Sequence, residues 1–274
     1  MKRVLLLLLV AFAFKQGICG QVDTIAVYSP AMHKNVPVVV IVPDQYKTMD
    51  VRYPVLYLLH GHSGNYRDWV TRAPEIKQYV DEFGMIVVCP DGGYDSWYFD
   101  APENSSVRYE SFMTRVLVPT IDSAYRTLAD KSQRGICGLS MGGHGAMYLA
   151  LRHQGLFGAV VSMSGGVDIR PFPDNWGIKK QLGDIKTHKE NWEKNTVINL
   201  VDGLKNGSLH IRLDIGTSDF FLKVNRALHQ KLLDMGIHHE YTERPGGHTW
   251  AYWRNAIPYE MLFFRKVFRS EGVD

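Results

Sequence analysis

The pentapeptide Gly138-Leu139-Ser140-Met141-Gly142 is the stretch that decides the fold. It follows a predicted strand at residues 134–137 and opens a run of helical character at residues 143–150. A serine between two glycines at a strand-to-helix junction is typical of a sharp turn that lifts the hydroxyl clear of the backbone, because a side chain at either glycine would be crowded. An exposed serine hydroxyl is still a poor nucleophile without a base. The pattern predicts that Ser140 is a nucleophile and that a base lies elsewhere in the chain.

Short β-rich apolar runs alternate with helical stretches along the chain, which is typical of a mainly parallel sheet covered by helices on both faces. Helices are predicted over residues 74–83, directly after Ser140, over 220–235 and over 249–268, where Pro258 is expected to kink or divide the helix. The interval 168–208 has no clear strand and is predicted to form a short lid insertion after the sixth strand. Eight strands are predicted, at residues 24–28, 36–42, 55–59, 85–89, 134–137, 159–163, 209–215 and 240–244.

The base for Ser140 should be a histidine in a loop beyond a late strand. His248 fits best among the eleven histidines, because it follows the predicted strand at 240–244 through Pro245-Gly246-Gly247, whose flexibility lets the ring reach the serine. The acid that orients this ring should lie between the serine and the histidine in the chain. Asp219 is favoured, since it lies just past the end of a strand, where its carboxylate can fix the imidazole tautomer. Asp214 competes but lies within the strand.

Two backbone N–H groups should point at the negative charge that develops on the reacting carbonyl oxygen. Met141, directly after the serine, is predicted to provide one of them. His62 is predicted to provide the other, because the glycine-rich loop at residues 60–64 follows the strand at 55–59 and can approach a substrate closely. The side chains or backbone expected to contact the substrate are those of His60, Gly61, Trp176 and Trp192.

The first twenty residues differ from the rest, since Lys2 and Arg3 precede an apolar run at residues 4–14. That run is shorter than the ~20 residues a bilayer crossing needs, so residues 1–20 are interpreted as a secretory signal peptide cut after Gly20. No transmembrane segment is then expected in the mature chain, which should be exported to the periplasm or the cell exterior. Cys19 leaves open a lipid-anchored lipoprotein, which the lead-in at 16–18 disfavours. Residues 21–274 are predicted to form one folded domain.

Charge and cysteine content exclude several classes of function. The 274-residue chain has a formal net charge of +3, and loss of residues 1–20 removes Lys2, Arg3 and Lys15 and no acids, which brings the charge to zero. A neutral chain gives no electrostatic reason to expect nucleic acid or anionic lipid as a partner. Cys89 and Cys137 are not at metal-ligand spacing, so neither a zinc site nor a disulfide framework is expected. No cofactor and no metal are predicted.

At these residues the sequence resembles the esterase family of the α/β-hydrolase fold that includes S-formylglutathione hydrolase, feruloyl and acetyl esterases, tributyrin esterases and the mycolyltransferases. In that family the acid is the aspartate after Gly-x-x, which supports Asp219 over Asp214. His62 stands where many relatives carry an apolar residue, so the resemblance implies an unusually polar pocket on the alcohol side. The matching stretches, in the family's order, lie at residues 53–61, 90–93, 138–146, 214–220 and 247–250.

The resemblance implies an α/β-hydrolase with a Ser140, His248 and Asp219 triad that hydrolyses short-chain acyl or hydroxycinnamoyl esters, on small molecules or carbohydrates, through an acyl-enzyme. Two alternatives stay open: an acyltransferase that passes the acyl group to a carbohydrate hydroxyl, and a non-catalytic carbohydrate-binding module on the same fold. The usual strand order of this fold places the strand at 55–59 between those that end at Cys89 and Cys137. Their Cα atoms would then be about 9–10 Å apart, so both are expected to be free thiols.

Overall fold

The computed structural model describes residues 20–270, so the expected signal peptide lies outside the described residues apart from Gly20. Its centre is one sheet of eight strands, and all eight predicted strands occur in it within a few residues of their expected bounds. The strands are β1 (Gln21–Ser29), β2 (Lys34–Val42), β3 (Val55–Leu59), β4 (Ile86–Pro90), β5 (Arg134–Leu139), β6 (Ala159–Met163), β7 (His210–Gly216) and β8 (Glu240–Arg244).

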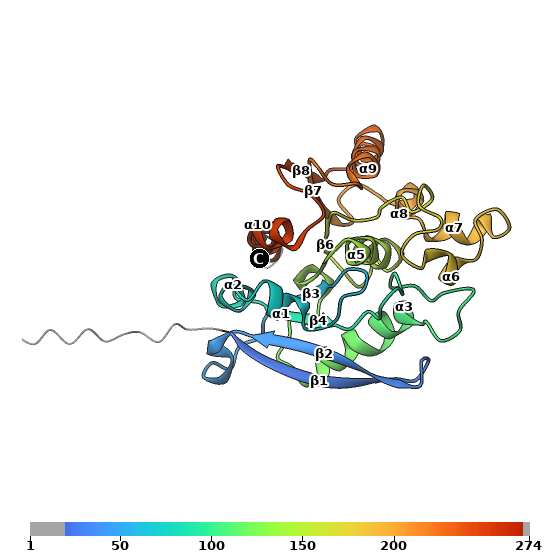
Figure 1. Cartoon of the computed structure of the whole chain (residues 1–274). Helices are drawn as coiled ribbons and strands as arrows, with labels where there is room; N and C mark the ends of the chain where they lie inside the picture. Colours follow the sequence, from blue (N-terminus) through green and yellow to red (C-terminus); the bar gives the residue numbers. More distant parts are fainter. Residues whose placement is uncertain (1–19, 271–274) are drawn as a thin grey trace, which may run out of the picture.

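The strand order is β1-β2-β4-β3-β5-β6-β7-β8, and Figure 1 shows the sheet running from the β1–β2 hairpin to β8 at the opposite edge. β1 pairs with β2 and β2 with β4 in antiparallel fashion, whereas every pair from β4 to β8 is parallel. The prediction of a mainly parallel eight-stranded sheet is confirmed. Because β3 separates β4 from β5, Cys89 and Cys137 lie on strands that are not neighbours, and both are free and buried.

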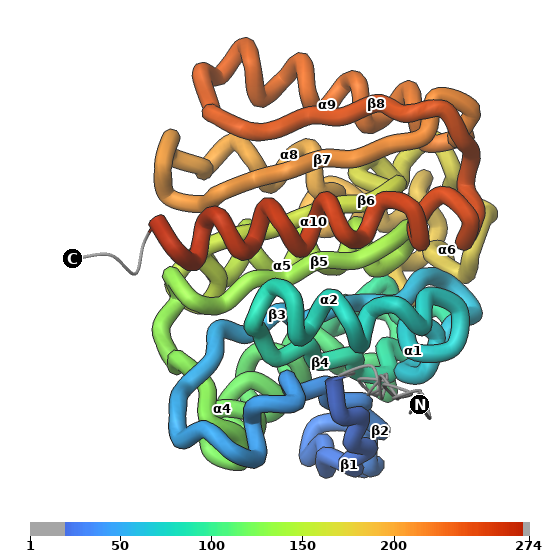
Figure 2. The backbone as a smooth tube through the Cα atoms, turned by 90° about the vertical axis from the view of Figure 1, so that its left-hand side faces the viewer, coloured from blue at the N-terminus to red at the C-terminus, as the bar shows by residue number. Residues whose placement is uncertain are grey.

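Helices cover both faces of the sheet, as the buried parallel strands require. On one face lie α1, α2 and α10, seen in front of the strands in Figure 2, while α5 and α9 pack with the remaining helices on the other. The helices are α1 (Asp68–Arg72), α2 (Ile76–Phe83), α3 (Tyr109–Ser111), α4 (Val118–Ala124), α5 (Met141–Arg152), α6 (Ile178–Leu182), α7 (Lys189–Asn195), α8 (Val197–Leu200), α9 (Leu222–Asp234) and α10 (Trp250–Ser270). The shorter turns are the 3₁₀ helices η1 (Asp44–Lys47), η3 (Lys131–Gln133) and η4 (Val201–Gly203) and the π-helix η2 (Phe112–Leu117).

Pro258 does not divide the last helix, which corrects one of the two outcomes expected for it. α10 is 21 residues long and continues through Pro258 without ending. A proline in a helix interior costs about 3 kcal/mol. The apolar face of α10 is buried against the sheet, with Ile257, Met261 and Phe264 among its fully buried side chains. The burial of several large apolar side chains, at roughly 1.5–3 kcal/mol each, outweighs the cost of the proline.

Within the described residues, the insertion between β6 and β7 contains no strand, as expected, and holds several short helical segments. It contains α6, α7, α8 and η4, joined by short turns. The insertion therefore follows the sixth strand, as predicted, but part of it is packed into the protein core and is not a free loop. Within residues 20–270, no helix combines the length and the apolar character needed to cross a membrane.

Candidate active site

Ser140 lies at the turn between β5 and α5 in a backbone conformation that few non-glycine residues adopt, with φ +56° and ψ −117°. Two glycines make room for this turn. A Cβ atom on Gly138 would lie 2.2 Å from the carbonyl oxygen of Gly142, and one on Gly142 would lie 2.5 Å from the carbonyl oxygen of His60. Strained backbone of this kind persists only where the surroundings enforce it, and it is concentrated at functional sites.

His248 and Asp219 are brought to Ser140 by the loops that follow β8 and β7. Nε2 of His248 lies 2.8 Å from Oγ of Ser140, and Nδ1 of His248 lies 2.8 Å from Oδ2 of Asp219. The backbone N–H of Phe221 donates to the other carboxylate oxygen of Asp219 at 2.8 Å. The three side chains named from the sequence therefore form one continuous line of hydrogen bonds.

This arrangement fixes which nitrogen of His248 can accept a proton. The side chain of Asp219 is fully buried and that of His248 is 14% exposed. A carboxylate can only accept a hydrogen bond, so Nδ1 carries the proton and Nε2 presents its lone pair to the serine hydroxyl. An imidazole in this position can take the proton of Ser140 while the carboxylate stabilises the resulting positive charge.

Asp214, the competing candidate, lies elsewhere. Its side chain is fully buried within β7, where it accepts hydrogen bonds from Tyr252 and Arg244. Asp214 makes no contact with His248 among those the structure describes, so the geometry separates two aspartates that are only five positions apart in the sequence.

The two residues predicted to supply amides for the reacting oxygen belong to segments that adjoin Ser140. Met141 begins α5, directly after the serine. The loop of His62 approaches from the end of β3, and a Cβ atom on Gly61 would lie 3.3 Å from Cβ of Ser140. The N–H of His62 donates to no backbone or side-chain group in the described part of the chain. A carbonyl oxygen next to Ser140 could therefore receive a hydrogen bond from it.

His60 shapes this loop and does not reach the cleft, which corrects the expectation that it contacts substrate. The side chain is 1% exposed. Its Nε2 accepts a hydrogen bond from the N–H of Gly92 at 2.7 Å, and its Nδ1 lies 2.8 Å from the carbonyl oxygen of Gly61. Burial lowers the pKa of His60, so the ring is neutral and can hold both bonds.

A cleft of about 220 Å³ opens over Ser140 and has one strongly aromatic wall. The ring of Trp176 stacks on that of Phe220 at a centroid distance of 5.4 Å, and Phe220 lies 4.2 Å from the ring of His248. Trp176 is held in a left-handed conformation, with φ +49°, and its carbonyl oxygen accepts a hydrogen bond from the indole of Trp97. The residues that line the cleft are Gly61, His62, Gly64, Asp68, Leu139, Ser140, Trp176, Phe220, His248, Trp250 and Trp253.

Trp192 is not in this cleft, so the structure separates the two tryptophans that the sequence grouped together. Trp192 is fully buried in the core, where its indole donates to the carbonyl oxygen of Gly183 at 3.0 Å. Sequence reasoning missed Phe220 and Trp250 instead. Both could have been named from the sequence, because Phe220 directly follows Asp219 and Trp250 comes two positions after His248.

No group of three or more histidine, cysteine or acidic side chains in residues 20–270 is arranged to hold a metal ion.

Comparison with known proteins shows the family to which the chain belongs. A family model described as “Putative esterase” matches residues 29–264. The chain belongs to this esterase family.

Individual members of the esterase family are moderately similar to this chain. An esterase of Mycobacterium tuberculosis is 31% identical over 242 residues, which are 77% of this chain but 52% of that protein. The chain thus spans about half the length of this relative. The acetyl esterase of Caldicellulosiruptor saccharolyticus is 27% identical over 259 residues, which are 88% of this chain and 96% of that protein.

The fold is that of the α/β-hydrolase esterases. A solved ferulic acid esterase is 28% identical, superposes with a TM-score of 0.79, and the match covers 91% of this chain and 99% of that one. The predicted fold class is thereby confirmed.

Proposed function

We propose that this chain is an exported serine carboxylesterase that hydrolyses short-chain acyl or hydroxycinnamoyl esters, on small molecules or carbohydrates. The observation that carries the proposal is the line of two 2.8 Å hydrogen bonds from Asp219 through His248 to Ser140, at the floor of a cleft in an esterase-family chain. Export is proposed from residues 1–20, whose basic start and apolar run have the profile of a signal peptide.

In the acylation step, Oγ of Ser140 attacks the ester carbonyl carbon while Nε2 of His248 takes the hydroxyl proton. The N–H groups of Met141 and His62 bind the oxyanion of the tetrahedral intermediate, and removal of one such donor typically costs ~3–4 kcal/mol of transition-state stabilisation. His248 then gives its proton to the alcohol oxygen. The bond between the carbonyl carbon and that oxygen breaks, the alcohol leaves, and the acyl group stays on Ser140.

In the deacylation step, His248 takes a proton from water as the water oxygen attacks the acyl carbon. The second tetrahedral intermediate collapses with transfer of that proton to Oγ of Ser140, and the carboxylic acid leaves. Asp219 stays ionised throughout and stabilises the imidazolium that forms in each half of the cycle.

The size and lining of the cleft support a small or flat acyl group. Its volume of about 220 Å³ is below the ~300 Å³ at which drug-sized ligand pockets begin. The stacked rings of Trp176 and Phe220 offer a flat apolar surface beside His248, which suits either a short alkyl chain or a planar aromatic acyl group. Relatives carry names of both kinds, an acetyl esterase and a ferulic acid esterase.

The test is a substrate panel on the purified chain: p-nitrophenyl esters from acetate upward, methyl ferulate and acetylated xylan. Hydrolysis should be fastest for acetate to butyrate or for methyl ferulate and should fall with longer alkyl chains. Prior treatment with phenylmethylsulfonyl fluoride should abolish it, with one adduct at Ser140 by peptide mass. If the chain cleaves none of these esters, the proposal is refuted. If it transfers the acyl group to an added sugar in preference to water, the chain is an acyltransferase and not a hydrolase.

A further inference from the structure

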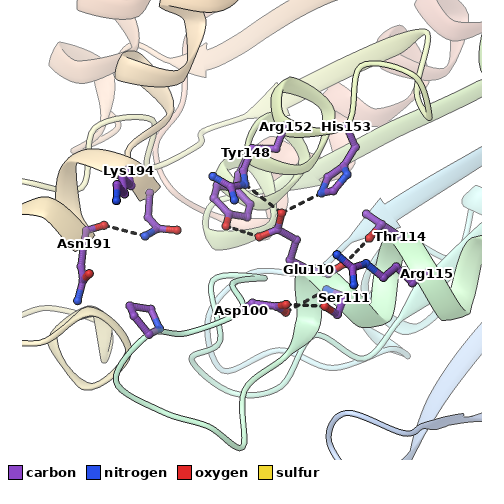
Figure 3. A pocket seen from close by; sticks show the side chains of 12 residues that line it. Asp100, Glu110, Ser111, Thr114, Arg115, Tyr148, Arg152, His153, Asn191 and Lys194 are labelled. Carbon is purple, nitrogen blue, oxygen red and sulfur yellow. Dashed lines mark hydrogen bonds and ion pairs between the residues drawn. The ribbon is translucent and has the colours of Figure 1, made fainter.

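A second pocket, of about 310 Å³, lies between α5, α7 and the segment that contains α3 and η2. Figure 3 shows side chains that reach into the pocket from three sides. They are Tyr148, Arg152 and His153 from the end of α5, Asn191 and Lys194 from α7, and Glu110, Ser111, Thr114 and Arg115 from the third segment. Its volume is at the lower end of the range for small-molecule sites, ~300–1,000 Å³. The remaining lining residues are Asp100, Pro102 and Asn195.

This pocket is distant from Ser140. The serine directly precedes α5, and Arg152 is the last residue of that 12-residue helix. At ~1.5 Å per residue, roughly 18 Å separate the two ends. A ligand in the pocket would not touch the reacting ester, so the inference does not depend on the proposed function.

Glu110 lies in the pocket and is held by three donors from the end of α5. It accepts hydrogen bonds from Tyr148 at 2.5 Å, from Nε of Arg152 at 2.9 Å and from His153 at 2.8 Å. Burial works against its ionisation, but these donors outweigh burial and lower the pKa of Glu110 to about 2. Its charge is therefore compensated within the protein, while the two terminal nitrogens of Arg152 make no hydrogen bond in the described part of the chain.

Two other charged groups of the pocket form no ion pair within residues 20–270, although the charges of Asp100 and Arg152 attract each other. Arg115 is exposed and has neither an ion pair nor a side-chain hydrogen bond within residues 20–270. Asp100 accepts hydrogen bonds from the N–H and the hydroxyl of Ser111, at 2.9 and 2.5 Å, and has no cation within ion-pair distance among the described residues. The pocket thus presents one cationic donor without a partner and one carboxylate that no cation contacts directly.

Asn195 adds an uncharged acceptor that is held in place. The residue is only 9% exposed, and its Nδ2 donates to the carbonyl oxygen of Asn191 at 2.7 Å. That bond orients the side-chain amide and leaves its Oδ1, which has no described partner, as an acceptor at the pocket wall. This oxygen can therefore accept a hydrogen bond from a ligand that donates one.

We propose that this pocket binds a small monocarboxylate that carries hydroxyl groups, of the chemical class of the uronic acids. The ligand carboxylate binds Arg115 and the free nitrogens of Arg152, because a guanidinium matches a carboxylate in bidentate geometry. The ligand hydroxyls donate to Asp100 and to Oδ1 of Asn195. A doubly charged phosphate is disfavoured by the nearby carboxylate of Asp100. A neutral sugar is disfavoured because the lining has no tryptophan or phenylalanine, and its one tyrosine, Tyr148, is 1% exposed and offers no open face.

The test measures binding directly, by calorimetric titration of the purified chain with D-glucuronate, D-glucose, L-alanine and inorganic phosphate. D-glucuronate should bind, and D-glucose and phosphate should bind at least tenfold more weakly. Arg115→Ala should weaken D-glucuronate binding about tenfold or more, as expected for loss of a charged hydrogen-bond partner. The matched control is Arg269→Ala, which removes an exposed arginine at the end of α10 and should leave binding unchanged.

The outcomes that overturn the proposal are distinct. Absence of D-glucuronate binding, equal binding of D-glucose, or an unchanged affinity in Arg115→Ala would each refute it. Tighter binding of L-alanine than of D-glucuronate would also refute it, because Asp100 would then be selecting an ammonium group in place of hydroxyls. Because Arg115 is exposed, its replacement should not unfold the chain, and a thermal melt of the variant checks this.

Discussion

The hydroxyl of Tyr252 lies 2.6 Å from Oδ1 of Asp214 and donates a hydrogen bond to it, deep inside the protein. Arg244 donates to the other oxygen of Asp214 and also pairs with Glu260. Burial, and then the charge of Asp214, raise the pKa of Glu260 well above its ordinary value. This network joins β7, β8 and α10 directly below the two loops that carry Asp219 and His248.

Asp214→Asn should therefore act on stability more than on chemistry. The change removes a buried negative charge and leaves Arg244 without that partner, which typically costs about 3–5 kcal/mol of unfolding free energy. Urea denaturation should show this loss, while the turnover of the folded fraction at low temperature should stay within about tenfold of the unmodified chain. A much larger loss of turnover with unchanged stability would assign the orienting role to Asp214.

Asp219→Asn should act on turnover more than on stability, the opposite of Asp214→Asn. An amide at this position can stabilise the wrong imidazole tautomer and cannot stabilise an imidazolium, so turnover should fall on the order of 10⁴-fold. Ester hydrolysis and urea denaturation on the same preparation separate this effect from unfolding. Retention of more than a tenth of the turnover would remove Asp219 from the proposed mechanism.

Ser140→Ala should abolish ester hydrolysis and preserve the fold. The change deletes the atom that forms the acyl-enzyme, so less than about 1% of the turnover should remain. The circular dichroism spectrum should be unchanged. The alanine has to adopt the same strained backbone, with φ +56°, that Ser140 adopts. Turnover above that level in a contamination-free preparation would show that another group attacks the ester.

His144 should make stability depend on pH below neutrality. Burial lowers its pKa from 6.5 to about 4, and its ring lies between Trp97 and Phe99 with Nδ1 bonded to the carbonyl oxygen of Gly166. Between those pH values the unfolded chain binds a proton that the folded chain does not. The stabilising contribution is therefore fully present above pH 6.5 and is lost as the pH falls toward 4, by up to about 1.4 kcal/mol per pH unit.

Urea denaturation at several pH values measures this slope. His144→Phe keeps an aromatic ring in the site and should flatten the slope, although His60, whose pKa burial also lowers, will still contribute in the same direction. Replacement of the exposed His238 by glutamine is the control and should leave the slope unchanged. An identical slope in His144→Phe would mean that His144 is not buried as a neutral ring.

Cys89 and Cys137 should behave as inert thiols in the folded protein. Both are buried, and burial raises the pKa of each thiol. The chain without residues 1–20 should show no reaction with a thiol reagent when folded and two reactive thiols when denatured without reductant. Detection of no thiols after denaturation would contradict the strand order, which places β3 between the two cysteines.

Features that depend on neighbouring residues were predictable from the sequence. The glycines at 138 and 142 indicate a crowded turn because the steric conflict is local, and the structure places a backbone carbonyl within 2.5 Å of each missing Cβ. The alternation of buried strands and helices likewise follows from local hydrophobic pattern, so all eight strands and the parallel sheet were recovered. The order in which Ser140, Asp219 and His248 follow strand ends favoured them as a group, since the ends of parallel strands lie at one edge of the sheet, and the family pattern supported Asp219 over Asp214.

Which side chain faces the cleft and which enters the core was decided only by the tertiary structure. Trp176 and Trp192 lie in the same insertion, yet one stacks on Phe220 beside His248 and the other is fully buried. Pro258 predicts a kink or a break, and α10 does not break because the sheet buries its apolar face. The position of His60 in the sequence suggests a substrate contact, but both of its ring nitrogens are used by Gly92 and Gly61. Each outcome depends on the packing of segments far apart in the sequence, and the free energy of burial belongs to that packing and not to any local pattern.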